Sequence, residues 1–196
     1  MANAKTEKVV YGLKNVHYAL LNRDESGAVT YGTPKPIPGA VNIGLTADSE
    51  TVEFYADDMV YYSTTENNGY TGDIEMANVP DDFKKEVFND VIEEGMLYEL
   101  SDKLTNHIAI LAEFDTDAVA KRIVLYDVLC SRPDVSGKTK EKTKTPQTQK
   151  MSLTARPVEI NGRKVVKGNT TATMAEEAYN NFFKAVVMPK AATTTT

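Results

Sequence analysis

Apolar and polar residues alternate along most of the chain, which is the pattern of β-strands that bury one face. The alternating segments are residues 16–20, 28–31, 41–47, 71–76, 107–114 and 151–155. Turn-forming residues between Arg23 and Gly27 predict that the first two of these segments form a hairpin. Residues 120–130 are apolar on both sides, so we expect a strand that is covered on both faces.

Two segments have helical rather than strand periodicity. In residues 80–95, a proline stands near the start, two aspartates occupy the first turn, and Gly95 is placed to cap the end. The apolar stripe of this helix is Phe83, Val87, Phe88, Val91 and Ile92. Thr173 to Glu176 fits a capping box, and the apolar positions that follow, up to Val187, predict a second helix. The sequence therefore predicts a mainly β fold with flanking helix.

The chain length of 196 residues fits one domain with a single core. We assign residues 1–190 to this domain and residues 191–196 to a flexible tail. Two long loops interrupt the domain, at residues 48–69 and 131–147.

These two loops differ in composition. The first is acidic and rich in tyrosine, and it ends in the turn signal Asn67-Asn68-Gly69. Short strands at residues 52–55 and 59–62 are compatible with its sequence. The second loop is rich in Lys and Thr and poor in apolar residues, so we expect a mobile loop or an extended hairpin tip.

Charge is distributed unevenly along the chain, whose net charge is -6. Residues 36–83 contain ten acids and no Lys, Arg or His, whereas residues 121–167 contain twelve Lys or Arg and four acids. Either both regions are solvated surface, or the acidic region of one copy binds the basic region of the next, a head-to-tail contact that generates rings or filaments. The candidate inter-subunit residues are Asp48, Glu50, Glu53, Asp57 and Asp58 on the acidic side and Lys138, Lys140, Lys142 and Lys144 on the basic side.

No motif in the sequence supports an enzyme. Ser136-Gly137-Lys138-Thr139 resembles the end of a phosphate-binding loop, but Arg132 stands where the motif needs a glycine. The two histidines, His17 and His107, have no metal-ligand spacing, and Cys130 continues an apolar strand face. We therefore predict no catalytic residues, no metal and no cofactor.

The composition also bears on the cellular setting. A single cysteine excludes an intrachain disulfide framework, and we find no apolar stretch of signal-peptide or membrane-spanning length. We expect synthesis in a reducing cytoplasm and no membrane association. An acidic chain is also a poor candidate for tight duplex binding, which depends on Lys and Arg.

The order of these segments resembles the major tail protein of long-tailed bacteriophages, the subunit of the tail tube. The resemblance covers roughly residues 8–190. It is most specific in Ile37 to Ala47, the acidic insertion, Gly69 to Pro80 and the helix with Phe83 and Val87. The thirteen residues from Asn78 to Asp90 also match the type found in phages of Gram-positive bacteria. It implies a β-sandwich flanked by a helix, whose copies form six-membered rings that stack into a hollow tube. The inner wall of such a tube is a shared β-barrel to which each subunit gives four strands.

Carried onto this chain, the resemblance places the inner strands near residues 41–47, 70–77, 121–130 and 148–156. It also implies that loops 48–69 and 131–147 reach a neighbouring subunit or ring. The side chains expected to face the lumen are Asn42, Thr46, Asp73, Glu75, Ser152 and Thr154. Lys150 lies on the same predicted face and departs from a uniformly acidic lumen.

The function implied is that of a virion structural protein, made in the host cytoplasm and located in the tail, through which double-stranded DNA passes without specific binding. The partners implied are further copies of the chain, the tape measure protein, the tail terminator and the distal tail proteins. Two alternatives stay open. One is the tube of a phage-like bacteriocin or injection device. The other is a stand-alone β-barrel that binds a carbohydrate or small ligand through Tyr55, Tyr61, Tyr62 and Tyr70, although tyrosine clusters also mark self-association surfaces.

Overall fold

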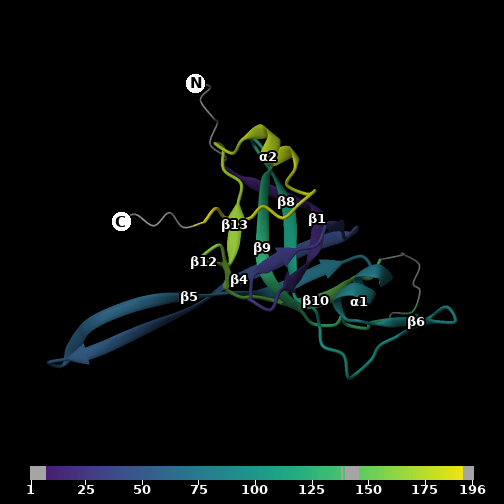
Figure 1. Cartoon of the computed structure of the whole chain (residues 1–196), viewed down its shortest axis with the longest axis horizontal. Helices are drawn as coiled ribbons and strands as arrows, with labels where there is room; N and C mark the ends of the chain where they lie inside the picture. The colour runs from purple at the N-terminus through teal and green to yellow at the C-terminus, as the bar shows by residue number, and fades with distance from the viewer. Residues whose placement is uncertain (1–7, 138, 140–145, 192–196) are drawn as a thin grey trace.

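The computed structural model describes residues 8–137, 139 and 146–191, and it is dominated by one large antiparallel sheet (Figure 1). Strands account for 54% and helices for 7% of the structure, which confirms the prediction of a mainly β fold. The strand order is β2-β1-β8-β9-β10-β5-β4, with β3 added on β1 and β13 on β9. The strands of this sheet are β1 (Val10–Arg23), β2 (Val29–Tyr31), β3 (Lys35–Pro36), β4 (Ala40–Ala56), β5 (Met59–Met76), β8 (Ile108–Thr116), β9 (Lys121–Cys130), β10 (Gln149–Ala155) and β13 (Lys167–Asn169).

Smaller elements surround this sheet. They are the hairpins β6–β7 (Val91–Glu93, Met96–Tyr98) and β11–β12 (Val158–Ile160, Arg163–Val165) and the helices α1 (Asp81–Val87) and α2 (Glu176–Asn180). The hairpin predicted near the N-terminus is confirmed, because β1 and β2 pair with Leu21 opposite Tyr31.

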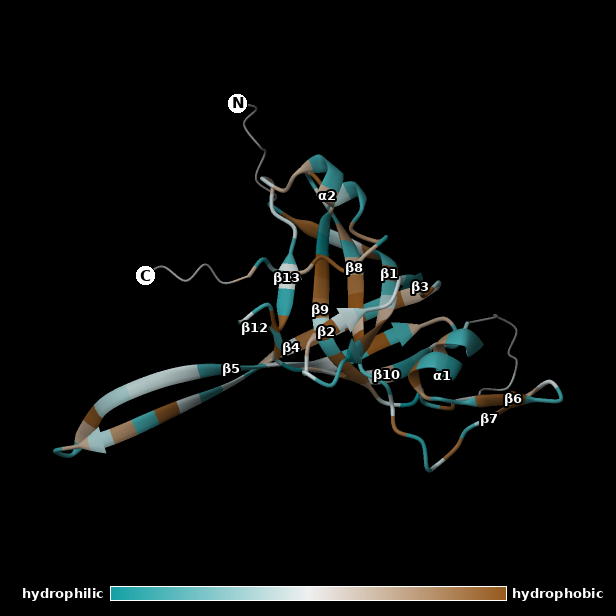
Figure 2. Cartoon of the chain, viewed as in Figure 1, coloured by the Kyte–Doolittle hydropathy of each residue, from teal (hydrophilic) through white to brown (hydrophobic). Residues whose placement is uncertain are grey.

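The core lies on both faces of β8 and β9, which are the most apolar strands in Figure 2. Ile110 and Leu125 belong to one apolar cluster, which also contains Phe83 of α1. Leu111 and Val124 belong to a second cluster on the other face, covered by the C-terminal segment. The expectation that residues 120–130 form a strand covered on both faces is therefore confirmed.

The first predicted helix is shorter than expected. Helix α1 ends at Val87, and residues 91–98 form the β6–β7 hairpin, so the prediction of one helix over residues 80–95 is wrong in its second half. Asn106 explains the early end, because its backbone N–H donates to Val87 O (2.7 Å) and its side-chain amide donates to Glu86 O (2.8 Å). These carbonyls would otherwise accept the next helical hydrogen bonds.

The residue expected to cap this helix has another role. Gly95 (φ 83°) and Glu94 (φ 50°) form the tight turn of the β6–β7 hairpin, and both need the left-handed region that such two-residue turns use. Ile92, which we placed in the apolar stripe, is 46% exposed on this hairpin.

The second predicted helix is also short. Helix α2 has five residues, Ala175 precedes it as the N-cap, and no side chain caps it. The Thr173 hydroxyl instead lies 3.1 Å from the Thr171 hydroxyl, so the predicted capping box is not formed. The apolar residues that follow nevertheless reach the core, with Phe182 2% and Val186 9% exposed.

Residues 48–69, which we described as a long loop, are instead the outer part of the β4–β5 hairpin, and we call them the arm. Pairing runs without interruption by a loop from Ala40 to the turn at Asp57 and Asp58, so the two short strands expected here are parts of longer ones. The arm projects away from the rest of the molecule (Figure 1).

The predicted turn at Asn67-Asn68-Gly69 is a β-bulge. The register passes from Asp48–Gly69 to Ser49–Asn67, which leaves Asn68 without a partner on β4. Gly69 has a φ of 115°, and a Cβ there would lie 1.9 Å from Ala155 O. The Asn67-Asn68-Gly69 segment therefore does depart from regular strand geometry, but it bends β5 instead of reversing the chain direction.

The second expected loop is described only in part. Residues 131–137 and 146–148 have no regular secondary structure, whereas Lys138, Lys140, Lys142 and Lys144 lie outside the described residues. The same holds for residues 192–196 of the predicted tail. Among the helices that the structure describes, none has the length and apolar character needed to cross a membrane.

Candidate assembly surface

The four strands that the resemblance assigns to an inner wall are consecutive neighbours in one sheet, in the order β9-β10-β5-β4. The register aligns Thr154 and Thr46 with Thr71, and Ser152 with Asp73. Directly opposed residues of antiparallel strands point to the same side. All the predicted lumen residues therefore share one face of this sheet: Asn42, Thr46, Asp73, Glu75, Ser152 and Thr154.

The opposite face of the same strands packs into the core and fixes this register. Ile74, Met151 and Leu153 are each 1% exposed. A slip of one residue would turn Asp73 and its neighbours into the core, at a large desolvation cost. Burial of one face thus determines which side chains the other face presents.

Lys150 lies on the polar face, opposite Glu75, so this face is not uniformly acidic. Its Nζ is 2.8 Å from Asp73 Oδ2, and the Ser152 hydroxyl donates to Asp73 Oδ1 at 3.1 Å. The hydrogen bond from Lys150 lowers the pKa of Asp73, and the same bond raises the pKa of Lys150. The cation is therefore held ionised beside an ionised acid, and the pair presents little net charge.

Strand β4 forms one edge of the large sheet and is 17 residues long. An edge strand carries a row of unpaired backbone N–H and C=O groups that can pair with another chain. Proteins commonly block such edges with lysine or proline, and residues 40–56 contain neither. Three irregularities in the β4–β5 register, together with the acids on β4, are what opposes pairing of this edge with another chain.

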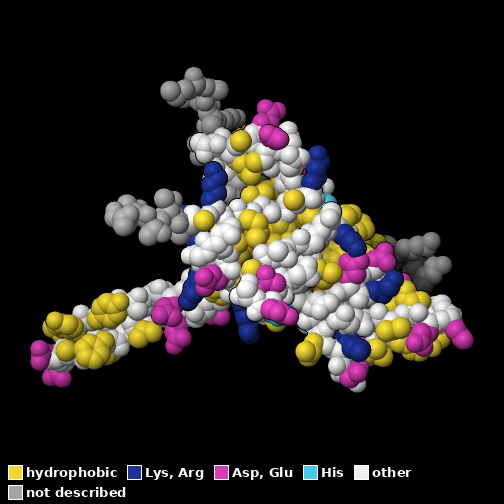
Figure 3. All heavy atoms as spheres, viewed as in Figure 1, with side chains coloured by type: hydrophobic (Ala, Val, Ile, Leu, Met, Phe, Trp, Pro, Cys, Tyr) yellow, Lys and Arg dark blue, Asp and Glu magenta, His cyan; other side chains and the backbone are white. Residues whose placement is uncertain are grey.

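The arm exposes both apolar and acidic side chains. Phe54 is 60% and Tyr61 74% exposed, and their rings are in edge-to-face contact at a centroid distance of 6.5 Å. Figure 3 shows hydrophobic side chains gathered on the outer part of the arm, with acidic side chains at its tip and nearer its base. All the acidic inter-subunit candidates are exposed on it: Asp48, Glu50, Glu53, Asp57 and Asp58.

The tyrosines proposed for a ligand site are spread along the arm and its base. Tyr55, Tyr61 and Tyr62 are exposed on the arm, whereas Tyr70 lies at its base, 4.3 Å from the Lys167 ammonium. A shallow pocket of about 310 Å³ lies elsewhere, between residues 30–33 and the C-terminal segment. The arrangement favours contact along an extended surface over enclosure of a small molecule.

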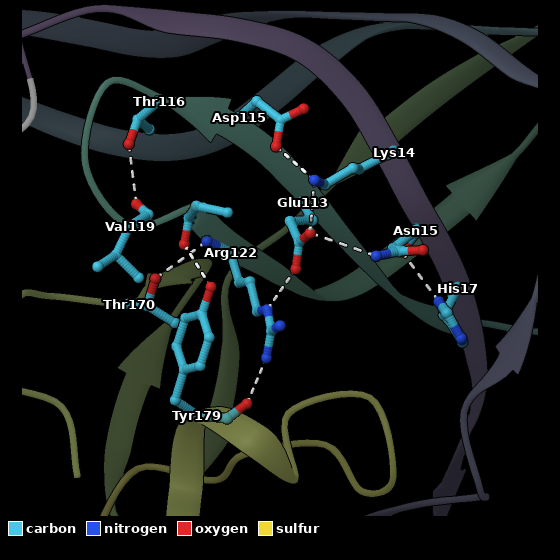
Figure 4. Close-up of polar contacts among 11 residues, drawn as sticks. Lys14, Asn15, His17, Glu113, Asp115, Thr116, Val119, Arg122, Thr170 and Tyr179 are labelled. Carbon is cyan, nitrogen blue, oxygen red and sulfur yellow. Dashed lines mark hydrogen bonds and ion pairs between the residues drawn. The ribbon is translucent and has the colours of Figure 1, made fainter. Parts of the chain in front are cut away.

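Buried ion pairs are the polar feature that sequence reasoning missed (Figure 4). Glu113 is 4% exposed, and its Oε2 lies 2.5 Å from Arg122 Nε. The Arg122 guanidinium also lies over the Tyr179 ring at 3.7 Å and donates to the Tyr179 carbonyl. Because Tyr179 belongs to α2, this network ties the C-terminal segment to the sheet.

The two histidines and the cysteine contact other residues of the fold. His17 stacks on Phe183 at 4.7 Å, and His107 contacts the buried carboxylate of Asp127. Burial raises the pKa of the Cys130 thiol to about 12, which leaves it un-ionised at neutral pH. Among the described residues, no group of three or more side chains is arranged to hold a metal ion.

Comparison of the chain with models of protein families finds no match, and comparison with curated proteins finds none either. Neither comparison supports the resemblance noted from the sequence.

Proposed function

We propose that this protein is a self-assembling structural subunit of the kind that forms the tail tube of long-tailed bacteriophages. The observation that carries this proposal is the part of the sheet formed by β10, β5 and β4, which buries one face, presents a polar face, and ends in the open edge of β4. The fourth strand expected in an inner wall, β9, is instead covered on both faces. Joining such sheets edge to edge between copies satisfies the free backbone groups, and closing the ring removes the exposed edge.

The dimensions of such a ring fit its proposed cargo. With four strands from each copy, as the resemblance implies, six copies would supply roughly 24 strands, which at ~4.8 Å spacing and ~40° tilt give a circumference of ~150 Å. The bore left after side chains is roughly 35–40 Å, wide enough for hydrated duplex DNA.

The polar face supplies the surface that such a bore needs. It carries hydroxyls, amides and carboxylates, and Lys150 is paired with Asp73. This composition disfavours phosphate binding, which requires unpaired Lys or Arg. Passage of DNA without specific binding follows, with no catalytic step.

The remaining parts of the proposal come from the resemblance. In the tail of a virion, the tube would meet the tape measure protein inside and the tail terminator and distal tail proteins at its ends. The same assembly would serve a phage-like bacteriocin or injection device with a different cargo.

Electron microscopy of the purified protein tests this function, together with sedimentation over a range of concentrations. Rings or tubes with an open bore support it, whereas a particle that stays monomeric at every concentration and salt overturns it. A monomer that binds a carbohydrate would favour the ligand-binding alternative.

A matched pair of variants tests the open edge itself. Thr46→Lys places a charge on β4, and we expect it to block assembly. Ser152→Lys adds the same charge to the same face but on β10, inside the sheet, and should still assemble. Equal assembly by both variants would contradict pairing through β4.

A further inference from the structure

The arm lacks a core of its own. β10 pairs with β5 only as far as Tyr70, opposite Ala155, so the arm continues as a two-stranded ribbon. Isolated two-stranded hairpins are marginally stable in water. Phe54 and Tyr62 lie opposite each other on it, 60% and 59% exposed, and form an apolar surface that folding of the single chain leaves uncovered.

The charge of the arm is unbalanced. Residues 48–69 contain six acids and no Lys, Arg or His. Glu50 lies directly opposite Glu66, an arrangement that destabilises a strand pair. Within the described ranges no ion pair relieves either glutamate. The residue alternation of β4 puts Glu50 on the same side as Phe54, so this side of the arm combines apolar and anionic groups.

A complementary surface lies in the segment after β10. We call Arg156, Arg163, Lys164 and Lys167 the basic strip; all four are exposed. Val158 and Ile160, in the hairpin that carries part of it, are 3% and 2% exposed, so the strip is fixed on the core. In the part of the chain that the structure describes, none of its four cations forms an ion pair with a carboxylate.

Only the base of the arm contacts the basic strip of its own chain. The strip lies at the base of the arm, where a Cβ on Gly69 would be 3.3 Å from Arg156 Cα. From that base the arm runs outward (Figure 1), over roughly 30 Å at ~3.3 Å per residue. Glu50 and Glu66, nearer the base, form no ion pair with this strip within the described residues, so we look for their partner on a second molecule.

We infer that the arm of one copy docks on the basic strip of a second copy, with Glu50 and Glu66 facing Arg163 and Lys164. This inference rests on the proposed self-assembly and names the acceptor surface. It differs from the expectation drawn from the sequence, in which the lysines of loop 131–147 receive the arm. Arm and strip are different surfaces, so a head-to-tail contact between them propagates into rings or filaments, whereas a reciprocal exchange of arms would close as a two-fold dimer.

Charge reversal with rescue tests the inference. Glu50→Lys with Glu66→Lys, and separately Arg163→Glu with Lys164→Glu, should each reduce sedimentable polymer at least about tenfold at low salt. An equimolar mixture of the two variants should restore assembly, because each arm then meets a strip of opposite charge. All four substitutions are at exposed positions, and unchanged thermal unfolding of each variant shows that its fold is intact.

The control changes the same charge on another exposed hairpin. Glu93→Lys with Glu94→Lys in β6–β7 should leave assembly as in the unsubstituted protein. Full assembly by the arm variant, or absence of rescue in the mixture, overturns the inference.

Replacing Lys138, Lys140, Lys142 and Lys144 by Glu separates the two acceptors. If this loop variant fails to assemble while the Arg163/Lys164 variant assembles, the loop is the acceptor, and the inference is wrong although the proposed function stands. If the unsubstituted protein forms no polymer, the proposed function fails and the inference fails with it.

Discussion

Lys150 and Asp73 lie side by side on β10 and β5, with Lys150 Nζ 2.8 Å from Asp73 Oδ2, on the face proposed to line the bore. The carboxylate covers a cation that would otherwise be available to phosphate. Repeated around rings and along a tube, each such pair would prevent one site of attraction for DNA.

Removing the acids should therefore make the tube wall retain DNA. Asp73→Asn alone leaves Glu75 opposite Lys150, so the variant combines Asp73→Asn with Glu75→Gln. We expect several-fold more duplex to co-sediment with assembled protein at low salt, and this binding to decline steeply toward about 200 mM salt. Adding Lys150→Gln should return it to the original level. No gain in DNA retention would contradict the role given to Asp73.

The network in Figure 4 makes a prediction about stability. Arg122→Ala leaves Glu113 buried without its close partner and should lower the free energy of unfolding by about 3–5 kcal/mol. Lys14→Ala removes an exposed partner of the same carboxylate and should have a much smaller effect than Arg122→Ala, because solvent screens the pair. Urea denaturation measures both values. Equal losses would show that burial of the Arg122 pair does not determine its contribution.

Two glycines on paired strands should respond differently to the same change. A Cβ on Gly72 would lie 1.9 Å from Gly44 O, so Gly72→Ala must shift the β4–β5 backbone and should cost about 1–3 kcal/mol. A Cβ on Gly44 meets nothing within 4 Å, so Gly44→Ala should be close to neutral or slightly stabilising. Chemical denaturation compares them, and a reversed order would refute the close approach at Gly72.

Cys130 should be inert in the folded protein. It is 5% exposed, and burial raises its pKa to about 12, so little thiolate is present or accessible at pH 8. A chromogenic thiol reagent should modify it at the rate of unfolding in buffer and within seconds in denaturant. Rapid modification under native conditions would show that this face of the sheet opens.

The Tyr18–Glu86 hydrogen bond should shape the pH dependence of stability. Burial opposes ionisation of Glu86, but hydrogen bonds from Lys35 and Tyr18 outweigh it and lower the pKa of this carboxyl. Its contribution is therefore present above the ordinary glutamate pKa and is lost as the pH falls through the folded value. Burial and Glu86 raise the pKa of Tyr18, whose contribution is present below about pH 10 and is lost at higher pH.

A variant separates these two effects. Glu86→Gln should flatten the acid limb of the free energy of unfolding against pH, and the exposed Glu176→Gln should leave it unchanged. Denaturant titrations between pH 3 and pH 11 measure both curves. If the acid limb of the Glu86 variant is unaltered, the Tyr18–Glu86 hydrogen bond does not contribute to the loss of stability at low pH.

The sequence predicted best the strands that have one buried face. Alternation at residues 71–76 and 151–155 placed Ile74 and Met151 in the core and Asp73 and Ser152 on the polar face, because one-sided burial imposes a period of two. The arm gave no such signal. Both of its faces are exposed, so no core selects an alternation, and its residues were interpreted as a loop.

The other misses depend on partners distant in sequence. The apolar stripe of residues 83–92 fits a longer helix, but Asn106 occupies the carbonyls at its end. The Glu113–Arg122 pair had a readable signal. Each charge interrupts an apolar strand, and the two positions fall opposite each other across the β8–β9 connection, as the register has them. The burial of this pair depends on α2, more than 50 residues further along the chain, so the sequence around Glu113 and Arg122 could not predict it.

The unpaired edge of β4 has a consequence for how this protein behaves when it is produced. A long edge strand without lysine or proline can pair with another backbone, including in a wrong register, and only its acids and its register irregularities oppose this. Under the proposed assembly, free chains would avoid such pairing only at low concentration, and ordered growth would have to consume them faster than they pair at random. We expect overproduction to end in precipitate unless a nucleus that starts orderly polymerisation is present from the outset.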